Sequence, residues 1–419
     1  MKEMEQYIIE LAKRAKEAAP VMALQTTGKK NTALQTMANA LRAQKKEILA
    51  ANAKDMEAGR DKGLTKALLD RLLLTHERIE SMAQGLEALI QLTDPIGDTI
   101  AMWRQPNGLE IGRKRVPLGV IAIIYEARPN VTVDAAGLAF KTGNALILKG
   151  GSEAFESNKC LAHILQKAVK TCGMPSSAIQ LVETTDREAV SILLKQRQYV
   201  DVVIPRGGAG LIQFVVNNSS IPAIETGVGN CHVYIDKYAE IPMGVNIVFN
   251  AKTQRPAVCN AMETLLVHKD IAAEFLLALA EKLKEKPVEL HGCQRTCTIL
   301  KEAKPATEED WSTEYLDLIM AVKIVDSLED AMAHIKKYGT GHSEAIVTEN
   351  YTRAKAFTDG VDAAAVYVNA STRFTDGNEF GFGAEIGIST QKLHARGPMG
   401  LEALTTEKYV IYGTGQVRS

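Results

Sequence analysis

Hydrophobic residues recur at helical spacing through the first quarter of the chain, from Lys2 to about Asp94. In the first two segments they fall on one face each: Ile8, Ile9, Leu11 and Ala12, and then Leu34, Met37, Leu41 and Ile48. A spacing of three and four residues places such side chains on one stripe of an amphipathic helix. The pattern therefore predicts an all-helical opening, which the turn residues 94–98, Asp-Pro-Ile-Gly-Asp, bring to an end.

Two short strand-like runs follow between Thr99 and Pro117, on either side of the turn sequence Gln-Pro-Asn-Gly at 105–108. An Asn-Gly pair between two such runs is a strong hairpin signal, because both residues tolerate positive φ. Near the other end of the chain, residues 407–413 contain the apolar run Tyr-Val-Ile-Tyr after a glycine-rich loop. We expect this last strand to pair with another element or with another subunit.

From Pro117 onward, short apolar runs typical of buried strands alternate with helical segments. Strands are expected at 120–125, 145–148, 179–182, 200–204 and 222–224, and helices at 133–141, 152–170, 187–195 and 209–216. Beyond Glu225 strands are expected at 232–235, 264–268, 298–300, 321–325, 345–348 and 365–369, and helices at 241–252 and 272–284. This order predicts two α/β domains with parallel sheets, and ligands on such sheets bind outside the carboxyl ends of the strands.

Two strand-to-helix turns in the first α/β domain suit a nucleotide phosphate. Lys149-Gly150-Gly151-Ser152 offers an ammonium, two glycines and a serine expected to cap the next helix, where free backbone N–H groups attract an anion. An ordinary tight turn beside a solvated lysine is the alternative. The second turn, Pro-Arg-Gly-Gly-Ala-Gly at 205–210, lacks the Gly-x-Gly-x-x-Gly spacing of dinucleotide-binding turns. The candidate cofactor-binding residues here are Lys149, Gly150, Ser152, Gly207 and Gly208.

The composition places the chain among globular proteins and excludes several classes of partner. Its 419 residues are 46% hydrophobic, enough to bury a large core in two or three domains. The 49 basic and 50 acidic residues are mixed along the chain, so we expect neither nucleic acid nor an anionic membrane as a partner. The start, Met-Lys-Glu-Met-Glu-Gln, lacks the apolar region of a signal peptide, and we expect a cytoplasmic protein.

Six scattered cysteines are too few for a disulfide framework in a chain of this length, so we expect reduced thiols. Cys293 and Cys297, with His291 beside them, hint at a zinc site. A structural zinc ion needs four ligands, however, and no second pair with ligand spacing occurs, so we expect no metal.

Cys259 differs from the other cysteines because it stands between the helix over 241–252, which Pro256 ends, and the strand that begins at Thr264. A basic neighbour such as Arg255 would lower the pKa of this thiol toward the thiolate form, which attacks carbonyl carbon. The alternative is a cysteine that packs as a small hydrophobic residue, as most intracellular cysteines do.

Several long motifs occur in a characteristic order along the whole chain. They are Pro-Leu-Gly-Val at 117–120, Gly-Asn at 143–144 followed by Lys149, and Tyr-Glu-Ala-Arg-Pro-Asn-Val at 125–131, then the segment around Cys259 and the segments 325–346, 371–377 and 394–400. In these motifs the chain resembles the gamma-glutamyl phosphate reductase family of the aldehyde dehydrogenase superfamily.

The resemblance implies an aldehyde dehydrogenase-like α/β subunit in three parts. Residues 1–98 and 117–228 would bind NADP, residues 229–400 would form the catalytic domain, and residues 99–116 and 401–419 would build a homo-oligomer. The implied activity is the NADPH-dependent reduction of L-glutamyl 5-phosphate to L-glutamate 5-semialdehyde and phosphate, the second step of proline biosynthesis. Glutamate 5-kinase is the partner that would supply the labile acyl phosphate.

The implied chemistry makes Cys259 the nucleophile that expels phosphate and carries a thioester, which then accepts hydride. The backbone N–H of Cys259 and a side-chain amide would stabilise the oxyanion. The superfamily's asparagine has no clean counterpart here, since ungapped counting reaches Glu126. Asn130, four residues later, is the candidate, with a loop-structuring role as its alternative.

Other polar residues in the matched motifs have expected roles toward the cofactor or the substrate. Glu314 aligns with the glutamate that holds the nicotinamide ribose, although an ordinary surface glutamate is an equally good interpretation. Glu225 lies where hydrolytic relatives keep the glutamate that activates water, but a reductase has no use for such water, so its role stays open. His334 and His342 have no assigned chemistry, and we expect structural roles for them.

The implied substrate carries a phosphate and a carboxylate, and arginines bind both groups through paired hydrogen bonds. Arg255, Arg373 and Arg396 are the candidates, with surface salt bridges as the alternative for each. Two competing functions remain. One is an oxidative aldehyde dehydrogenase that prefers NAD and hydrolyses its thioester, and the other is a catalytically inactive NADP-binding scaffold.

Overall fold

The computed structural model describes residues 2–418, which form two compact units. Unit 1 contains the chain up to residue 225 together with 381–387 and the segment from 399 onward, and unit 2 contains 226–380 and 388–398. The predicted domain boundaries differ from this division, because residues 226–228 belong to unit 2 whereas 381–387 and 399–400 belong to unit 1. The two returning segments are joined to each other by backbone hydrogen bonds from Ile386 to Met399 and from Met399 to Gly387.

The opening of unit 1 is all-helical, as predicted. Its helices are α1 (Lys2–Ala23), α2 (Thr27–Ala43), α3 (Lys45–Asp61), α4 (Lys66–Leu72) and α5 (His76–Gln91). The side chains on the predicted apolar faces of α1 and α2, such as Leu11 and Leu34, are buried. Threonines at positions 26, 65 and 75 precede α2, α4 and α5, and each side chain accepts a hydrogen bond from the first turn of its helix.

The first α/β sheet has four parallel strands in the order β5-β4-β3-β6. The strands are β3 (Val120–Tyr125), β4 (Ala145–Lys149), β5 (Ile179–Leu181) and β6 (Val202–Arg206), and the helices are α6 (Asn130–Lys141), α7 (Phe155–Thr171), α8 (Glu188–Leu193) and α9 (Ala209–Asn218). The chain runs from β3 outward to β5 and then returns to place β6 on the other side of β3. The topological switch point, where such sheets bind ligands, therefore lies between β3 and β6. The strand expected at 222–224 is reduced to a single bridge between Ala223 and Val203.

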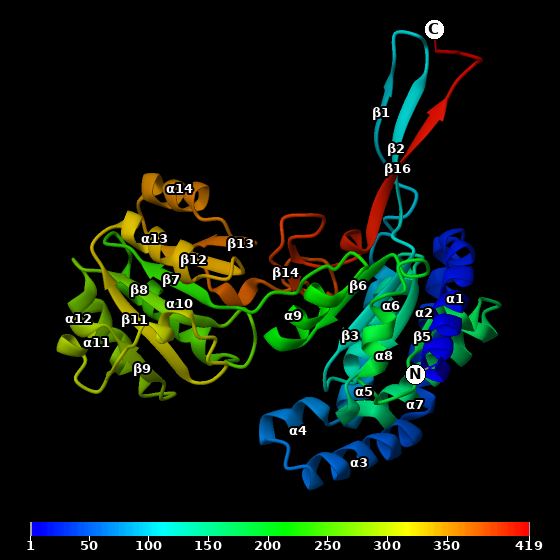
Figure 1. Cartoon of the computed structure of the whole chain (residues 1–419). Coiled ribbons are helices and arrows are strands. Elements are labelled where there is room, and N and C mark those ends of the chain that lie inside the picture. Colours follow the sequence, from blue (N-terminus) through cyan, green and yellow to red (C-terminus); the bar gives the residue numbers. More distant parts are fainter. Residues whose placement is uncertain (1, 419) are drawn as a thin grey trace. The chain divides into compact units, whose positions relative to one another are not determined.

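The predicted hairpin is confirmed as β1 (Thr99–Arg104) and β2 (Glu110–Pro117), and the C-terminal strand β16 (Thr405–Tyr412) pairs antiparallel with β2. This three-stranded sheet extends away from the rest of unit 1 (Figure 1). It exposes large hydrophobic side chains, namely Met102, Trp103, Tyr409, Ile411 and Tyr412. Exposed hydrophobic side chains on a sheet are typical of an interaction surface, which suits the predicted oligomerisation role; that role stays a prediction.

Unit 2 has a seven-stranded parallel sheet in the order β10-β9-β11-β8-β7-β12-β13. Its strands are β7 (Cys231–Ile235), β8 (Met262–His268), β9 (Glu289–Gly292), β10 (Lys304–Pro305), β11 (Ile319–Val325), β12 (Ser343–Val347) and β13 (Ala365–Val368). Its helices are α10 (Ile241–Thr253), α11 (Ala272–Leu283), α12 (Gln294–Ile299), α13 (Leu328–Tyr338) and α14 (Tyr351–Gly360). Short elements complete the two units: β14 (Ile388–Ser389), β15 (Gly397–Pro398) and five 3-10 turns at 152–154, 176–178, 309–312, 372–374 and 402–404.

Helices cover both faces of the unit 2 sheet. Val233 and Ile235 of β7 pack in a cluster with α10 and α11, whereas Tyr234 between them packs in a second cluster with α13 and α14. Successive side chains of a strand point to opposite faces, so the two clusters are the two faces of one doubly wound sheet. The predicted fold class is confirmed. The strand expected at 298–300 is wrong, because residues 294–299 form α12, and short apolar runs do not distinguish a strand from a buried helical turn.

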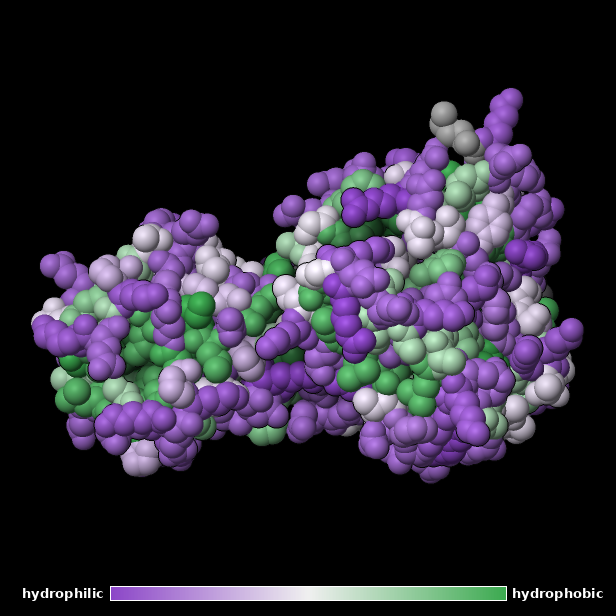
Figure 2. Space-filling view, turned by 90° about the horizontal axis from the view of Figure 1, so that it is seen from below, coloured by the Kyte–Doolittle hydropathy of each residue, from purple (hydrophilic) through white to green (hydrophobic). Residues whose placement is uncertain are grey.

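Figure 2 shows one face of each unit, where hydrophilic residues (purple) surround smaller groups of hydrophobic ones (green). Over residues 2–418, the structure contains no helix long and apolar enough to cross a membrane.

Candidate active site

The predicted nucleophile, Cys259, lies in the loop that joins α10 to β8, as the sequence indicated. Because the loop precedes β8, Cys259 stands at the amino ends of the unit 2 strands and not at the carboxyl ends, where ligands were expected. The base of the loop is held by an ion pair between Lys252 at the end of α10 and Glu263 on β8, 2.6 Å apart and both fully buried. Burial raises the pKa of Glu263 and lowers that of Lys252. The charge of each residue opposes the pKa shift of the other.

Two further contacts hold the backbone of Cys259 in place. The Cys231 thiol on β7 donates a hydrogen bond to the carbonyl oxygen of Cys259 at 3.1 Å. Burial raises the pKa of Cys231 well above its usual value, so this side chain stays a protonated donor. Gly229 packs so closely that a Cβ atom there would lie 1.5 Å from the same carbonyl oxygen. Both residues were missed in the sequence, where only the run Gly-Val-Gly-Asn-Cys at 227–231 marks them.

Glu314 is brought to this loop as well, since its Oε1 accepts a hydrogen bond from the backbone N–H of Gly229 at 2.8 Å. The carboxylate therefore supports the segment that packs against Cys259. Its expected contact with a nicotinamide ribose stays a prediction.

Of the three candidate arginines, two lie at the Cys259 loop. The Arg373 guanidinium donates to Oε1 of Gln254 at 2.8 Å and also contacts Oδ1 of Asn260, the residue after Cys259. Burial lowers the pKa of Arg373, and the nearby positive charge of Arg255, which is exposed on the same loop, adds to this shift. Two guanidinium groups close enough to repel each other form a natural site for an anion.

Arg396 has a different setting, because its guanidinium pairs with Asp362 at 2.7 Å and Asp362 also binds Lys392. This is the salt-bridge alternative considered for the arginines. Its role toward substrate stays a prediction.

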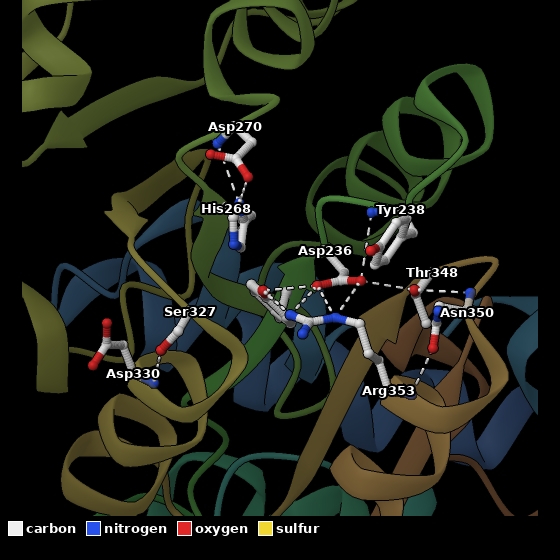
Figure 3. Close-up of polar contacts among 10 residues, drawn as sticks. Asp236, Tyr238, His268, Asp270, Ser327, Asp330, Thr348, Asn350 and Arg353 are labelled. Carbon is white, nitrogen blue, oxygen red and sulfur yellow. Dashed lines mark hydrogen bonds and ion pairs between the residues drawn. The ribbon is translucent and has the colours of Figure 1, made fainter.

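The carboxyl ends of β7 and β12 are closed by a buried polar network. Asp236, which follows β7, receives hydrogen bonds from Nη2 of Arg353 at 2.6 Å, from Thr348 at 2.8 Å and from the Tyr234 hydroxyl at 3.0 Å. Figure 3 shows Arg353 and Thr348 pointing at the two oxygens of this carboxylate. Both oxygens are satisfied within the chain, so this end of the sheet is held together by its own side chains.

The two signature histidines have structural surroundings. His342 is buried beside Cys231, with its Nδ1 2.8 Å from the Ser343 hydroxyl and 3.7 Å from the Cys231 sulfur. His334 packs among Trp311, Tyr338 and His232, and burial lowers its pKa to about 2, so it is neutral.

The three residues considered as zinc ligands, His291, Cys293 and Cys297, make contacts with other groups of the protein. Both ring nitrogens of His291 bind carboxylates, those of Asp310 at 2.6 Å and Glu289 at 2.7 Å. Cys297 contacts the Gly292 carbonyl, and the Cys293 sulfur contacts the hydroxyl of Thr296.

Unit 1 contains a cavity of about 780 Å³ at the carboxyl ends of β3 and β4. Its lining includes Tyr125, Lys149, Gly150, Ser152, Arg187 and Phe214. Lys149 is almost fully buried, donates to the Gly150 carbonyl at 2.9 Å, and has its pKa lowered by burial although nearby carboxylates oppose the shift. The volume suits a small-molecule cofactor. Three of the candidate cofactor residues thus share one cavity.

The expected cap at this turn is wrong, because Ser152 lies in a 3-10 turn and α7 begins three residues later, at Phe155. The start of α7 is capped by Asp55 of α3, which accepts hydrogen bonds from the backbone N–H groups of Glu156 and Ser157 and from the Ser157 hydroxyl. The helix terminus proposed for a phosphate already holds a carboxylate. Packing within the chain also explains Gly150 of this turn, since a Cβ there would lie 2.2 Å from Nδ2 of Asn158.

In the second glycine-rich turn, after β6, packing explains one of the three glycines, since a Cβ atom on Gly207 would lie 2.6 Å from Cδ of Glu126 and 2.8 Å from Leu211. A Cβ atom on Gly210 would meet no atom within 4 Å, and one on Gly208 would meet only the end of the Glu126 side chain, at 4.0 Å. Gly208 has φ −72°, which any residue adopts. Neither strain nor packing within the chain requires glycine at positions 208 and 210, so no side chain of these two residues blocks the close approach of a ligand.

Two candidate residues of unit 1 keep their roles only as predictions. Asn130 is exposed at the start of α6, and its amide donates to Oδ2 of Asp134 at 2.9 Å, which leaves its second N–H available to another acceptor. Glu225 is partly buried at the end of unit 1.

Comparison with known proteins gives a consistent result. The model of the aldehyde dehydrogenase family matches residues 2–299. The chain is 65% identical to gamma-glutamyl phosphate reductase of Moorella thermoacetica over 405 residues, 97% of each chain, and 62% identical to that of Clostridium novyi over 99% of this chain and 100% of the other. The crystal structure of gamma-glutamyl phosphate reductase from Thermotoga maritima is similar with a TM-score of 0.96 and 51% identity, over 98% of this chain and 100% of that one.

Proposed function

The chain belongs to the gamma-glutamyl phosphate reductases of the aldehyde dehydrogenase family, and we propose that it reduces L-glutamyl 5-phosphate with NADPH through a thioester on Cys259. The family consists of oxidoreductases of proline biosynthesis that use a nicotinamide cofactor. The main support for a thioester on Cys259 is the loop that contains it. A buried ion pair holds the base of this loop, and Arg255 and Arg373 lie beside Cys259.

The residues of unit 1 fit a dinucleotide. The cavity at the ends of β3 and β4 accommodates an adenosine, with Lys149 and Arg187 in its lining as cations for a 2′-phosphate. At the start of α9, glycines 208 and 210 carry no side chain that would block a pyrophosphate, which the backbone N–H groups and the helix dipole would favour. When bound, the cofactor supplies the hydride that reduces the thioester carbonyl carbon to the aldehyde.

The chain's own residues do the acyl transfer. The Cys259 thiolate attacks the acyl carbon and forms a C–S bond, and the C–O bond to phosphate breaks. The backbone N–H of Cys259, with the Asn130 amide as the candidate second donor, would stabilise the oxyanion in each step. Arg373 and Arg255 would bind the phosphate as it leaves. Cys259 must keep its position beside these arginines, and the contacts of its backbone with Cys231 and Gly229 hold it there.

Phosphate dependence of the reverse reaction tests this function directly. With glutamate 5-semialdehyde and NADP, the enzyme should form the thioester and then need inorganic phosphate to release the acyl group. Without phosphate, we expect no more than about one NADPH per subunit, the stoichiometry of one thiol, and Cys259→Ala should abolish even this burst. Sustained turnover without phosphate that disappears in Glu225→Gln would establish the hydrolytic dehydrogenase instead.

A further inference from the structure

A carboxylate stands at the switch point of the unit 1 sheet. Glu126 follows β3 directly and Gly208 follows β6, the neighbouring strand in the sheet. Oε2 of Glu126 accepts a hydrogen bond from the Gly208 backbone N–H at 3.1 Å, and the Glu126 backbone is tied to the carbonyl of Arg206 at 3.2 Å. Its side chain also lines the cavity. A negative charge of the protein therefore occupies the start of α9, where an anionic ligand is favoured.

The contrast with α7 indicates that this carboxylate is not a permanent cap. Asp55 at the start of α7 is 4% exposed and accepts three hydrogen bonds, two from backbone N–H groups and one from a hydroxyl. Glu126 is exposed and accepts one hydrogen bond, from the backbone N–H of Gly208, the residue before α9. A carboxylate with one bond and access to water is displaced far more easily than a buried carboxylate with three.

The glycines at the start of α9 supply the second observation. Glycine inside a helix is unfavourable compared with alanine, yet Gly210 in the first turn of α9 meets no neighbour. Before the capped N–H, packing explains Gly207, since a Cβ there would lie 2.6 Å from Cδ of Glu126. After the capped N–H, the backbone at Gly210 is bare, and a cap alone would not need this. The space is therefore suited to a larger anion than a glutamate side chain.

We propose that Glu126 is a displaceable anion that occupies the pyrophosphate position at the start of α9 and must leave when the dinucleotide binds. The inference rests on the proposed cofactor site. A carboxylate and a pyrophosphate repel each other a few ångströms apart and compete for the same N–H group. Glu126 is consequently an affinity-setting residue that weakens the binding of any ligand with a phosphate at α9.

The test is equilibrium binding to the Glu126→Gln variant, which keeps the size of the side chain and removes its charge. NADPH binding, followed by its fluorescence, should become about tenfold tighter, equivalent to about 1.4 kcal/mol. Adenosine 2′-monophosphate, which has no pyrophosphate, should bind both proteins equally in the same cavity. The matched control is Glu57→Gln, which changes the net charge by the same amount. Glu57 is exposed on α3 and lies outside the cavity lining.

Other outcomes overturn the inference in distinct ways. Weaker NADPH binding to Glu126→Gln would make Glu126 a ligand of the cofactor, and unchanged binding would make it a simple helix cap. An equal gain for adenosine 2′-monophosphate would show a general charge effect on the cavity. If neither the wild-type protein nor the variant bound NADPH, the proposed cofactor itself would be wrong, and the inference would fail with it.

Discussion

The Cys231 thiol donates a hydrogen bond to the backbone carbonyl oxygen of Cys259, 3.1 Å away. Its replacement in Cys231→Ala removes this donor from the carbonyl oxygen, at a cost of about 0.5 to 1.5 kcal/mol. Because the bond holds the backbone of the candidate nucleophile, we expect kcat to fall roughly tenfold with little change in the KM for NADPH. Cys160→Ala in α7 is the control. An unchanged kcat in Cys231→Ala would show that the loop is held without this bond.

Cys259 should be the one cysteine required for turnover, because in the proposed mechanism only a thiol at that position would carry the acyl group. We expect Cys259→Ala to bind NADPH with wild-type affinity and to show no measurable reduction of the acyl phosphate. Cys293→Ala and Cys297→Ala should remain active, since neither thiol lies on the α10–β8 loop. Retained turnover in Cys259→Ala, measured as phosphate release, would mean that the nucleophile is misassigned.

Lys149 should confer preference for NADPH over NADH. A charge-assisted contact with the 2′-phosphate contributes about 1.5 to 3 kcal/mol, or roughly ten- to a hundredfold in affinity. The Lys149→Ala variant should therefore lose NADPH affinity by this factor and keep its NADH affinity, whereas Lys170→Ala, an exposed lysine of α7, should change neither. Equal losses toward both cofactors would show that the ammonium contacts the ribose or shapes the turn.

The buried pair of Lys252 and Glu263 makes the Cys259 loop sensitive to loss of either partner. Removing one charge leaves the other uncompensated in the core, and we expect Lys252→Met to destabilise unit 2 by about 3 to 5 kcal/mol. The double replacement Lys252→Met with Glu263→Leu should recover most of this loss, since two apolar side chains fill the space without a buried charge. Denaturant unfolding in a Trp103→Phe background, followed by tryptophan fluorescence, would measure the stability of unit 2, because Trp311 of that unit is then the sole tryptophan.

The network around Asp236 predicts a pH-dependent stability. Burial by itself raises the pKa of Asp236, but hydrogen bonds from Arg353, Thr348 and Tyr234 outweigh it and leave the pKa below its usual value. A carboxylate with a depressed pKa stabilises the fold above the pKa of the unfolded state, about 3.9, and this contribution is lost as the pH falls through the folded-state value. Asp236→Asn should therefore cost about 3 kcal/mol at pH 7, measured through Trp311, and progressively less below about pH 4. A cost that does not change with pH would contradict the ionised pair.

Local pattern alone determined most elements and the place of the candidate nucleophile. The Asn-Gly turn at 107–108 predicted the hairpin of β1 and β2, and the uninterrupted apolar run at 120–125 matches β3 in both bounds. The helix that ends before Pro256 and the strand after it put Cys259 in a connecting loop. Each of these features depends on residues only a few positions apart, and their spacing can be read directly from the sequence.

Strand order decided what the pattern left open. Glu126 and Gly208 are 82 positions apart and meet because β3 pairs with β6, and Cys231 reaches Cys259 across 28 positions because β7 pairs with β8. Asp55 lies 102 positions from Ser157, whose backbone N–H it caps, so the serine that local sequence favoured for that helix end is not used. Hydrophobic periodicity specifies which face of an element is buried but not which partner covers it, and these contacts therefore emerge only in the folded chain.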